Sequence, residues 1–228
     1  MTDNAKKNTG THTARATRRS FLSRGLATSA GLVAAHAVTW PAAASAQGVG
    51  GAQTRLNFRD IQRHENDHVA FLLNVLGSNA RPKPTFQNLL QPNFREFFEV
   101  SQDLENTGVG AYLGAAPVIF DRGVLAAAGS IALIEGRHAG WVNTLVNDRI
   151  TVNVFGQEQS FERPLTIAEV VSLAGPFIAS LNGGPPLTFS LTPSAANDVA
   201  ILNFALALEF LEAEFYNLNV PEFFGQGK

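Results

Sequence analysis

Two glutamate–histidine pairs are the residues of this chain best suited to bind a metal ion. Glu65 precedes His68 by three positions, and Glu135 precedes His138 by the same spacing. Residues three apart on an α-helix share one face, so the carboxylate and the imidazole of a pair can reach one ion. Burying such groups without a partner costs roughly 2 to 7 kcal/mol even when they are neutral. We therefore expect a bound ion to compensate each pair.

The residues around these pairs repeat at helical spacing. Both segments read apolar, Glu, His, apolar, apolar, in the stripes Ile61, Glu65, His68, Leu72, Val75 and Ile131, Glu135, His138, Val142, Leu145. Two further segments place a glutamate seven residues before a tyrosine, in the stripes Ser101, Glu105, Gly108, Tyr112, Ala115 and Leu202, Ala205, Glu209, Glu212, Tyr216. These are the only two tyrosines of the chain. The pattern therefore predicts four helices that turn polar groups toward one centre.

This combination of residues predicts a two-metal carboxylate site. A glutamate from each of two helices and a Glu-x-x-His from each of two others form the ligand set of di-iron and di-manganese bundles. Carboxylates bridge and neutralise two hard divalent ions, and neutral imidazoles complete their coordination. The chain has no cysteine, so thiolate ligands are excluded. We predict two divalent ions, iron or manganese, bound by Glu65, His68, Glu105, Glu135, His138 and Glu209.

Four more polar residues are expected to surround the ligands. The hydroxyls of Tyr112 and Tyr216 could donate hydrogen bonds to the carboxylates. His64 is expected at the rim of the site. Glu212 stands where the other Glu–Tyr helix has Gly108, and direct ligation, proton relay or an edge position all stay open for it.

Four segments show the periodicity and the end residues of long helices. They cover about 57–76, 93–115, 122–146 and 194–217. Asn57 is expected to cap the first, Gly77 to end it, and Pro221 to end the last. Four helices of this length, about 30 Å each, pack as a bundle. The fold prediction is all-α, a four-helix bundle with a long irregular insert between the third and fourth helices.

Two connections are long enough to run the length of such a bundle. The first, 77–92, contains three prolines and reads as an extended crossover. The second is the insert, 148–192, in which we expect a strand-like stretch at 149–155, a short helix near 167–173 and a turn at 182–186. No chemistry is predicted for the insert.

The N-terminal 46 residues read as a twin-arginine export signal. Arg18 and Arg19 precede an Ala-rich apolar stretch that ends in Ala44-Ser45-Ala46, a small-residue cleavage site. Its removal leaves one domain, 47–228, in the periplasm or outside the cell. The segment holds six of the 17 basic and one of the 19 acidic residues, so the domain has a net charge of about −7. Nucleic acid is therefore an unsuitable partner, and no transmembrane segment is expected in the exported chain.

Four segments resemble the ferritin-like superfamily, and within it the desiccation-related proteins. They are 64–72, 104–114, 134–139 and 203–216. The resemblance implies a ferritin-like bundle and a role in stress protection. In that branch, however, the helix that resembles 203–216 comes first, whereas here it comes last. The resemblance therefore implies a circular permutation, or a last helix that completes a neighbour's bundle by swapping.

Three functions are compatible with these residues. A two-metal centre with an open position would react with oxygen or peroxide as an oxidase, peroxidase or catalase. A second interpretation is a non-catalytic stress-related protein whose metals staple the bundle. A third is a zinc peptidase, because His64-Glu65-Asn66-Asp67-His68 also spells H-E-x-x-H, although the second pair has Ile134 where a further histidine would stand. Metal identity and a homo-oligomeric state are left open by the sequence.

Overall fold

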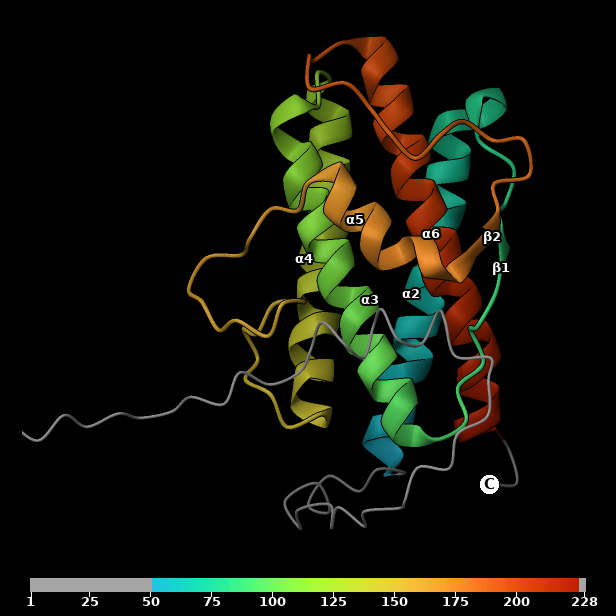
Figure 1. Cartoon of the computed structure of the whole chain (residues 1–228), viewed down its shortest axis with the longest axis vertical. Helices are drawn as coiled ribbons and strands as arrows, with labels where there is room; N and C mark the ends of the chain where they lie inside the picture. Colours follow the sequence, from blue (N-terminus) through green and yellow to red (C-terminus); the bar gives the residue numbers. More distant parts are fainter. Residues whose placement is uncertain (1–50, 226–228) are drawn as a thin grey trace, which may run out of the picture.

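Four long helices form the body of the computed structural model, which describes residues 51–225 (Figure 1). They are α2 (Ala52–Leu76), α3 (Phe94–Ala115), α4 (Arg122–Leu145) and α6 (Ala195–Phe224). Asn93, Asp121 and Ser194 cap α3, α4 and α6 by accepting hydrogen bonds from backbone N–H groups of the first turn. The all-α prediction is confirmed.

The helices pack as two antiparallel pairs, α2 with α6 and α3 with α4. Gln62 of α2 donates to Asn217, and Arg59 donates to the carbonyl of Phe224, so residue numbers fall along α6 as they rise along α2. Asn106 of α3 donates to Asn143 of α4, and Gly108, two residues later, lies beside Glu135, so these two helices also run in opposite directions. In the described chain, α6 is therefore the fourth helix of the bundle and lies against α2.

The two helix pairs are arranged so that α2 and α3 run in the same direction. Both long connections therefore run the length of the bundle, as their lengths predict. The ring of Phe58, near the start of α2, lies 4.6 Å from that of Phe97, near the start of α3, so these two helices run in one direction. The crossover between them contains a short 3-10 helix, Gly77–Asn79, and β1 (Thr85–Phe86). A 3-10 turn, Ala116–Val118, joins α3 directly to the antiparallel α4.

The insert packs on the outside of the bundle. It contains α5 (Ile167–Ala174), a 3-10 turn (Gly175–Phe177) and β2 (Ile178–Ser180), which pairs antiparallel with β1. Figure 1 shows α5 crossing the bundle, where it packs against α3. Leu165 lies just before α5, and a Cβ at Gly114 of α3 would lie 2.0 Å from its carbonyl oxygen. Gly114 therefore lets the insert backbone lie directly on α3.

Two apolar clusters fill the bundle, one toward each end. One is rich in aromatic rings: Phe58 lies 4.6 to 5.4 Å, between ring centroids, from Phe97, Phe98, Trp141 and Phe224. The other is mainly aliphatic and includes Leu72, Ile131 and Leu206. Between the two clusters lies a layer of buried polar side chains. Because each cluster holds all four helices together, the polar layer is fixed from both sides.

The first helix begins earlier than predicted. It starts at Ala52 after Gly51, so Asn57 lies inside the helix and is not its cap. The apolar stripe continues back through Phe58 to the buried Thr54, which favours the extra turn. Gly77 ends the helix as predicted, with φ of 53°. Val75 was wrongly placed in the buried stripe, because it is 45 % exposed and Leu76 is buried instead.

The last helix continues past Pro221, where we predicted its end. Proline removes one helical hydrogen bond. Two contacts offset this loss: the fully buried Phe224 packs against Phe58, and Arg59 donates to the Phe224 carbonyl.

The strand predicted at 149–155 is wrong. Within it the structure has only the isolated bridge between Val152 and Glu158. Side-chain amides replace a strand ladder: Asn143 donates to the Val152 carbonyl, and Asn153 accepts from the N–H groups of Phe155 and Gln157. The short helix and the 182–186 turn are present.

Residues 51–225 contain no helix with the length and apolar character needed to cross a bilayer. The predicted export signal, 1–46, lies outside the described residues.

Candidate metal centre

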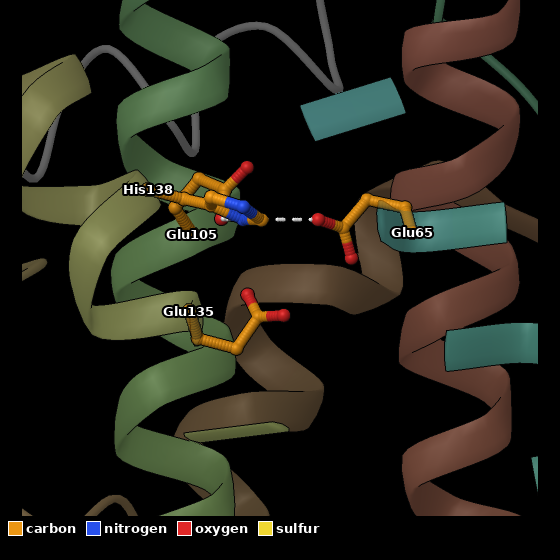
Figure 2. A group of neighbouring side chains, drawn as sticks. All are labelled: Glu65, Glu105, Glu135 and His138. Atoms are coloured by element: carbon orange, nitrogen blue, oxygen red, sulfur yellow. Dashed lines mark hydrogen bonds and ion pairs between the residues drawn. The ribbon is translucent and has the colours of Figure 1, made fainter. Parts of the chain in front are cut away.

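Six polar residues from the four long helices converge in the polar layer, and they are the six that the spacing predicts as ligands. They form two groups, each offering one ligand atom per residue with all atoms within 4.8 Å of one another. The first group is Glu65, Glu105, Glu135 and His138, drawn in Figure 2, and the second is Glu65, His68, Glu135 and Glu209. Such groups could hold metal ions.

Glu65 and Glu135 belong to both groups, so the two sites share them. The remaining members divide symmetrically into one histidine and one glutamate for each site. His138 Nδ1 lies 3.0 Å from Glu65 Oε1 and 3.2 Å from Glu105 Oε2. His68 Nδ1 lies 3.2 Å from an oxygen of Glu135 and 3.2 Å from one of Glu209. Two adjacent four-ligand sites with two common carboxylates therefore fit the side chains present.

The shared carboxylates are incompletely satisfied by the protein. Glu65 Oε1 and both carboxylate oxygens of Glu135 are buried without a hydrogen-bond partner. The histidine rings approach these oxygens but are not aligned to bond them. Orphaned buried charges are costly, and carboxylate oxygens and imidazole nitrogens are suitable ligands for divalent cations. The donor set therefore fits a metal.

Without a metal, the two histidines carry the positive charge of the centre. Burial alone lowers the pKa of His138, but Glu105 and Glu65 outweigh it and raise this pKa to about 11. The pKa of His68 is likewise raised, since Glu135, Glu209 and Glu65 outweigh its burial. Metal binding at Nδ1 must therefore displace a proton from each ring.

The carboxylates respond to the same charges in different ways. Burial raises the pKa of Glu65, but the two histidine rings outweigh it and hold this pKa at about 2. Burial and the neighbouring Glu65 and Glu105 charges raise the pKa of Glu135 well above its usual range. Burial raises the pKa of Glu209 to about 7, with His68 opposing the shift. A like-charged cluster of this kind favours an added cation.

Each tyrosine bonds to the glutamate of the other Glu–Tyr helix. Tyr112 on α3 donates to Glu209 Oε1 at 2.5 Å, and Tyr216 on α6 donates to Glu105 Oε1 at 2.5 Å. In both glutamates the other oxygen, Oε2, lies near a histidine. Helical spacing places each tyrosine on the right face but cannot indicate this cross-bundle pairing.

His64 contacts the centre through His138. Its Nδ1 lies 2.9 Å from His138 Nε2, and the two rings stack with their centroids 5.2 Å apart. His64 belongs to neither metal-ligating group, whereas H-E-x-x-H zinc binding requires it as a ligand. It is placed to orient the His138 ring.

Glu212 is buried beside the centre but belongs to neither group. Burial, with the charges of Glu135 and Glu209, raises its pKa well above the usual range. Gly108 makes room for it: a Cβ there would lie 3.1 Å from Glu135 Oε2 and 3.3 Å from Glu212 Oε1. The role of Gly108 was missed in the sequence, although its place in the stripe opposite Glu212 was visible.

A small apolar cavity of about 20 Å³ adjoins the tyrosine side of the centre. Tyr112 is its only polar lining residue. The lining also includes four alanines, at positions 111, 115, 128 and 205, where larger side chains would close the space.

Comparison with known proteins identifies the family of the chain. The model of the ferritin-like domain matches residues 25–148, which is more than half of the chain. The match begins within the predicted export signal and covers α2, α3 and α4, but not α6. No curated protein matches, and no solved structure matches. The chain therefore belongs to the ferritin-like domain family.

Proposed function

We propose that this protein binds two divalent ions, iron or manganese, and uses them in redox chemistry with dioxygen or peroxide. The observation that carries the proposal is the sharing of Glu65 and Glu135 between two four-ligand groups, combined with the orphaned oxygens of these two carboxylates. Glu105 and His138 would complete one site, and His68 and Glu209 the other. Four carboxylates would balance the charge of two divalent ions.

When bound, two such ions supply electrons to an oxidant that the side chains alone cannot reduce. The protein's own residues set the conditions. Tyr112 and Tyr216 hold Glu209 and Glu105, and His64 orients His138. Glu212 can hold a proton beside the centre. The apolar cavity against Tyr112 has room for about one water-sized molecule, which suits a small reactant such as dioxygen.

A second function is a metal staple without turnover. The near-complete burial of the centre supports it: Glu65, Glu105 and Glu135 are fully buried, and the His68 side chain is 12 % exposed. In this case the metals would tie α2, α3, α4 and α6 together and offset the cost of burying five glutamates.

Export and stress protection are part of the proposal. The twin-arginine pattern supports transport to the periplasm or exterior, with residues 47–228 as the exported domain. The similarity of four segments to desiccation-related proteins supports a role in oxidative or desiccation stress, and the order of these segments supports a circular permutation. N-terminal sequencing of the exported protein should start near residue 47; a start before residue 25 would contradict removal of the leader.

One experiment separates the functions. The exported protein is purified, its metals are counted by mass spectrometry, and its consumption of dioxygen and peroxide is measured. Two iron or manganese ions per chain with consumption support the redox function, and two without consumption support the staple. Fewer than two ions, with zinc predominant, would contradict the two-metal centre.

A further inference from the structure

Arg81, in the crossover after α2, is buried, and no carboxylate of residues 51–225 forms an ion pair with it. The residue is only 3 % exposed. All three guanidinium nitrogens, Nε, Nη1 and Nη2, are buried and lack a hydrogen-bond partner. Elsewhere in 51–225 no other arginine has all three nitrogens in this condition.

A guanidinium in this position needs an anion. Arginine stays protonated in proteins, and a buried charge is tolerated when it is paired. Burial lowers the pKa of Arg81, as expected of a charge removed from water.

The surroundings of Arg81 are held in place by two elements. Its backbone N–H donates to Asn203 of α6 at 2.6 Å. On the other side, the turn after β2 is fastened to the crossover, since Asn182 Nδ2 donates to the Lys83 carbonyl at 2.8 Å and to Thr85 Oγ1 at 3.0 Å. The β1–β2 pairing anchors the same two segments. The insert is therefore fixed over Arg81.

The turn lies directly against the guanidinium. Asn182 and Gly183 have φ of 51° and 77° and reverse the chain. At the next residue, Gly184, a Cβ would lie 2.9 Å from Arg81 Nη2. Any side chain here would press on the guanidinium, so glycine lets the turn pack against it.

We propose that Arg81 and the turn 181–184 bind a small oxyanion, a carboxylate or a phosphate. The planar guanidinium matches two oxygens of either group with parallel hydrogen bonds. The site is separate from the metal centre, because Asn203 precedes Glu209 by six residues, about 9 Å along α6. Anion binding would give the insert, for which the sequence predicted no chemistry, a function in ligand recognition.

The test uses thermal unfolding of the full chain, depleted of metal with EDTA, at constant ionic strength in chloride. Phosphate and acetate are titrated separately to 50 mM. At least one should raise the midpoint by about 3 °C or more, and the more effective anion identifies the chemical class. Arg81→Met should abolish the shift. Arg149→Met, which changes an insert arginine with a 77 % exposed side chain, should retain it.

Gly184→Ala provides a second variant that keeps the arginine. Its methyl group should weaken anion binding by about tenfold or more, measured by titration calorimetry. If Arg81→Met does not fold, the Gly184→Ala comparison still decides. Absence of a shift with both anions in the parent chain, or an equal shift in Arg81→Met or equal affinity in Gly184→Ala, would overturn the proposal.

Discussion

Tyr112 donates a hydrogen bond to Glu209 across the bundle, joining α3 to α6 at the edge of the metal centre. The mirror contact, from Tyr216 to Glu105, joins the same helices in the opposite sense. Each glutamate is thus held at one oxygen by a phenol and leaves the other beside a histidine. The two antiparallel helix pairs are cross-braced at the level of the proposed ligands.

Removing either phenol should loosen its glutamate. We expect Tyr112→Phe and Tyr216→Phe each to weaken metal binding by about 10- to 100-fold, the usual effect of losing an outer hydrogen bond to a ligand. Metal-binding titration with a competing chelator measures the change. Phe94→Leu, in the aromatic cluster away from the centre, serves as the control. Unchanged affinity in both tyrosine variants would contradict the bracing role.

The shared and unshared glutamates should differ in what their loss removes. We expect Glu65→Ala to abolish binding of both ions, and Glu105→Ala to leave about one ion per chain, because Glu65 belongs to both groups and Glu105 to one. Metal content by mass spectrometry gives the counts. Glu214→Ala, which removes a partly exposed partner of Lys83, should retain two. Equal losses in the two ligand variants would argue against shared carboxylates.

A methyl group at position 108 should disturb the centre directly. In Gly108→Ala the new Cβ would press on Glu135 and Glu212, so we expect about tenfold weaker metal binding. Gly129→Ala on α4 is the matched control, because nothing lies within 4 Å of its Cβ. That variant should gain up to about 1 kcal/mol of stability from helix propensity and bind metal normally. Chelator titration and urea unfolding separate the two effects, and normal binding by Gly108→Ala would refute the crowding.

The metal-free protein should lose stability as the pH rises. The pKa of His138 is raised to about 11, so its contribution is complete below its unfolded value of 6.5 and is lost between there and about 11. Glu209, with its pKa raised to about 7, has the same sign, because the folded protein retains a proton that the unfolded chain releases above 4.5. Urea unfolding in EDTA from pH 5 to 9 should show a falling free energy of unfolding.

Metal binding should show the opposite trend. The ion displaces protons from His68 and His138, so affinity should rise across the same pH range. A metal-free protein that becomes more stable toward pH 9 would contradict the assignment of two protonated histidines.

His64→Ala separates the two-metal centre from the zinc-peptidase interpretation. Because His64 contacts His138 but belongs to neither ligand group, we expect both ions to remain, with affinity lowered by about tenfold or less. Metal counting and a peptidase assay are the measurements. Loss of all metal together with a zinc-dependent peptidase activity in the parent chain would favour H-E-x-x-H instead.

Much of the fold follows from local sequence patterns. The Glu-x-x-His and Glu-x6-Tyr stripes lie on the helices and faces that 3.6-residue periodicity predicts, and the lengths of the two long connections match the bundle. The failures have causes that the pattern does not include. Pro221 lies inside α6 because the packing of Phe224 outweighs a lost hydrogen bond, and 149–155 forms turns because the side chains of Asn143 and Asn153 bond nearby backbone groups.

The contacts between side chains of the site could not be predicted from the sequence. Periodicity places Glu212 and Gly108 on the right faces, but it does not show that one makes room for the other. Nor does it show that Tyr112 reaches Glu209 rather than its own helix. Arg81 gives no sequence pattern at all, since its burial depends on a turn about 100 residues later.

The pairing of α2 with α6 also determines when the centre can assemble during synthesis. The hairpin of α3 and α4 is consecutive and can form as soon as it leaves the ribosome. Glu65 and His68 on α2, in contrast, cannot pack against Glu209 until α6 has been synthesised, after the other three long helices. Metal binding at the proposed centre would therefore be a late event, because the ligand set is incomplete until α6 has packed against α2.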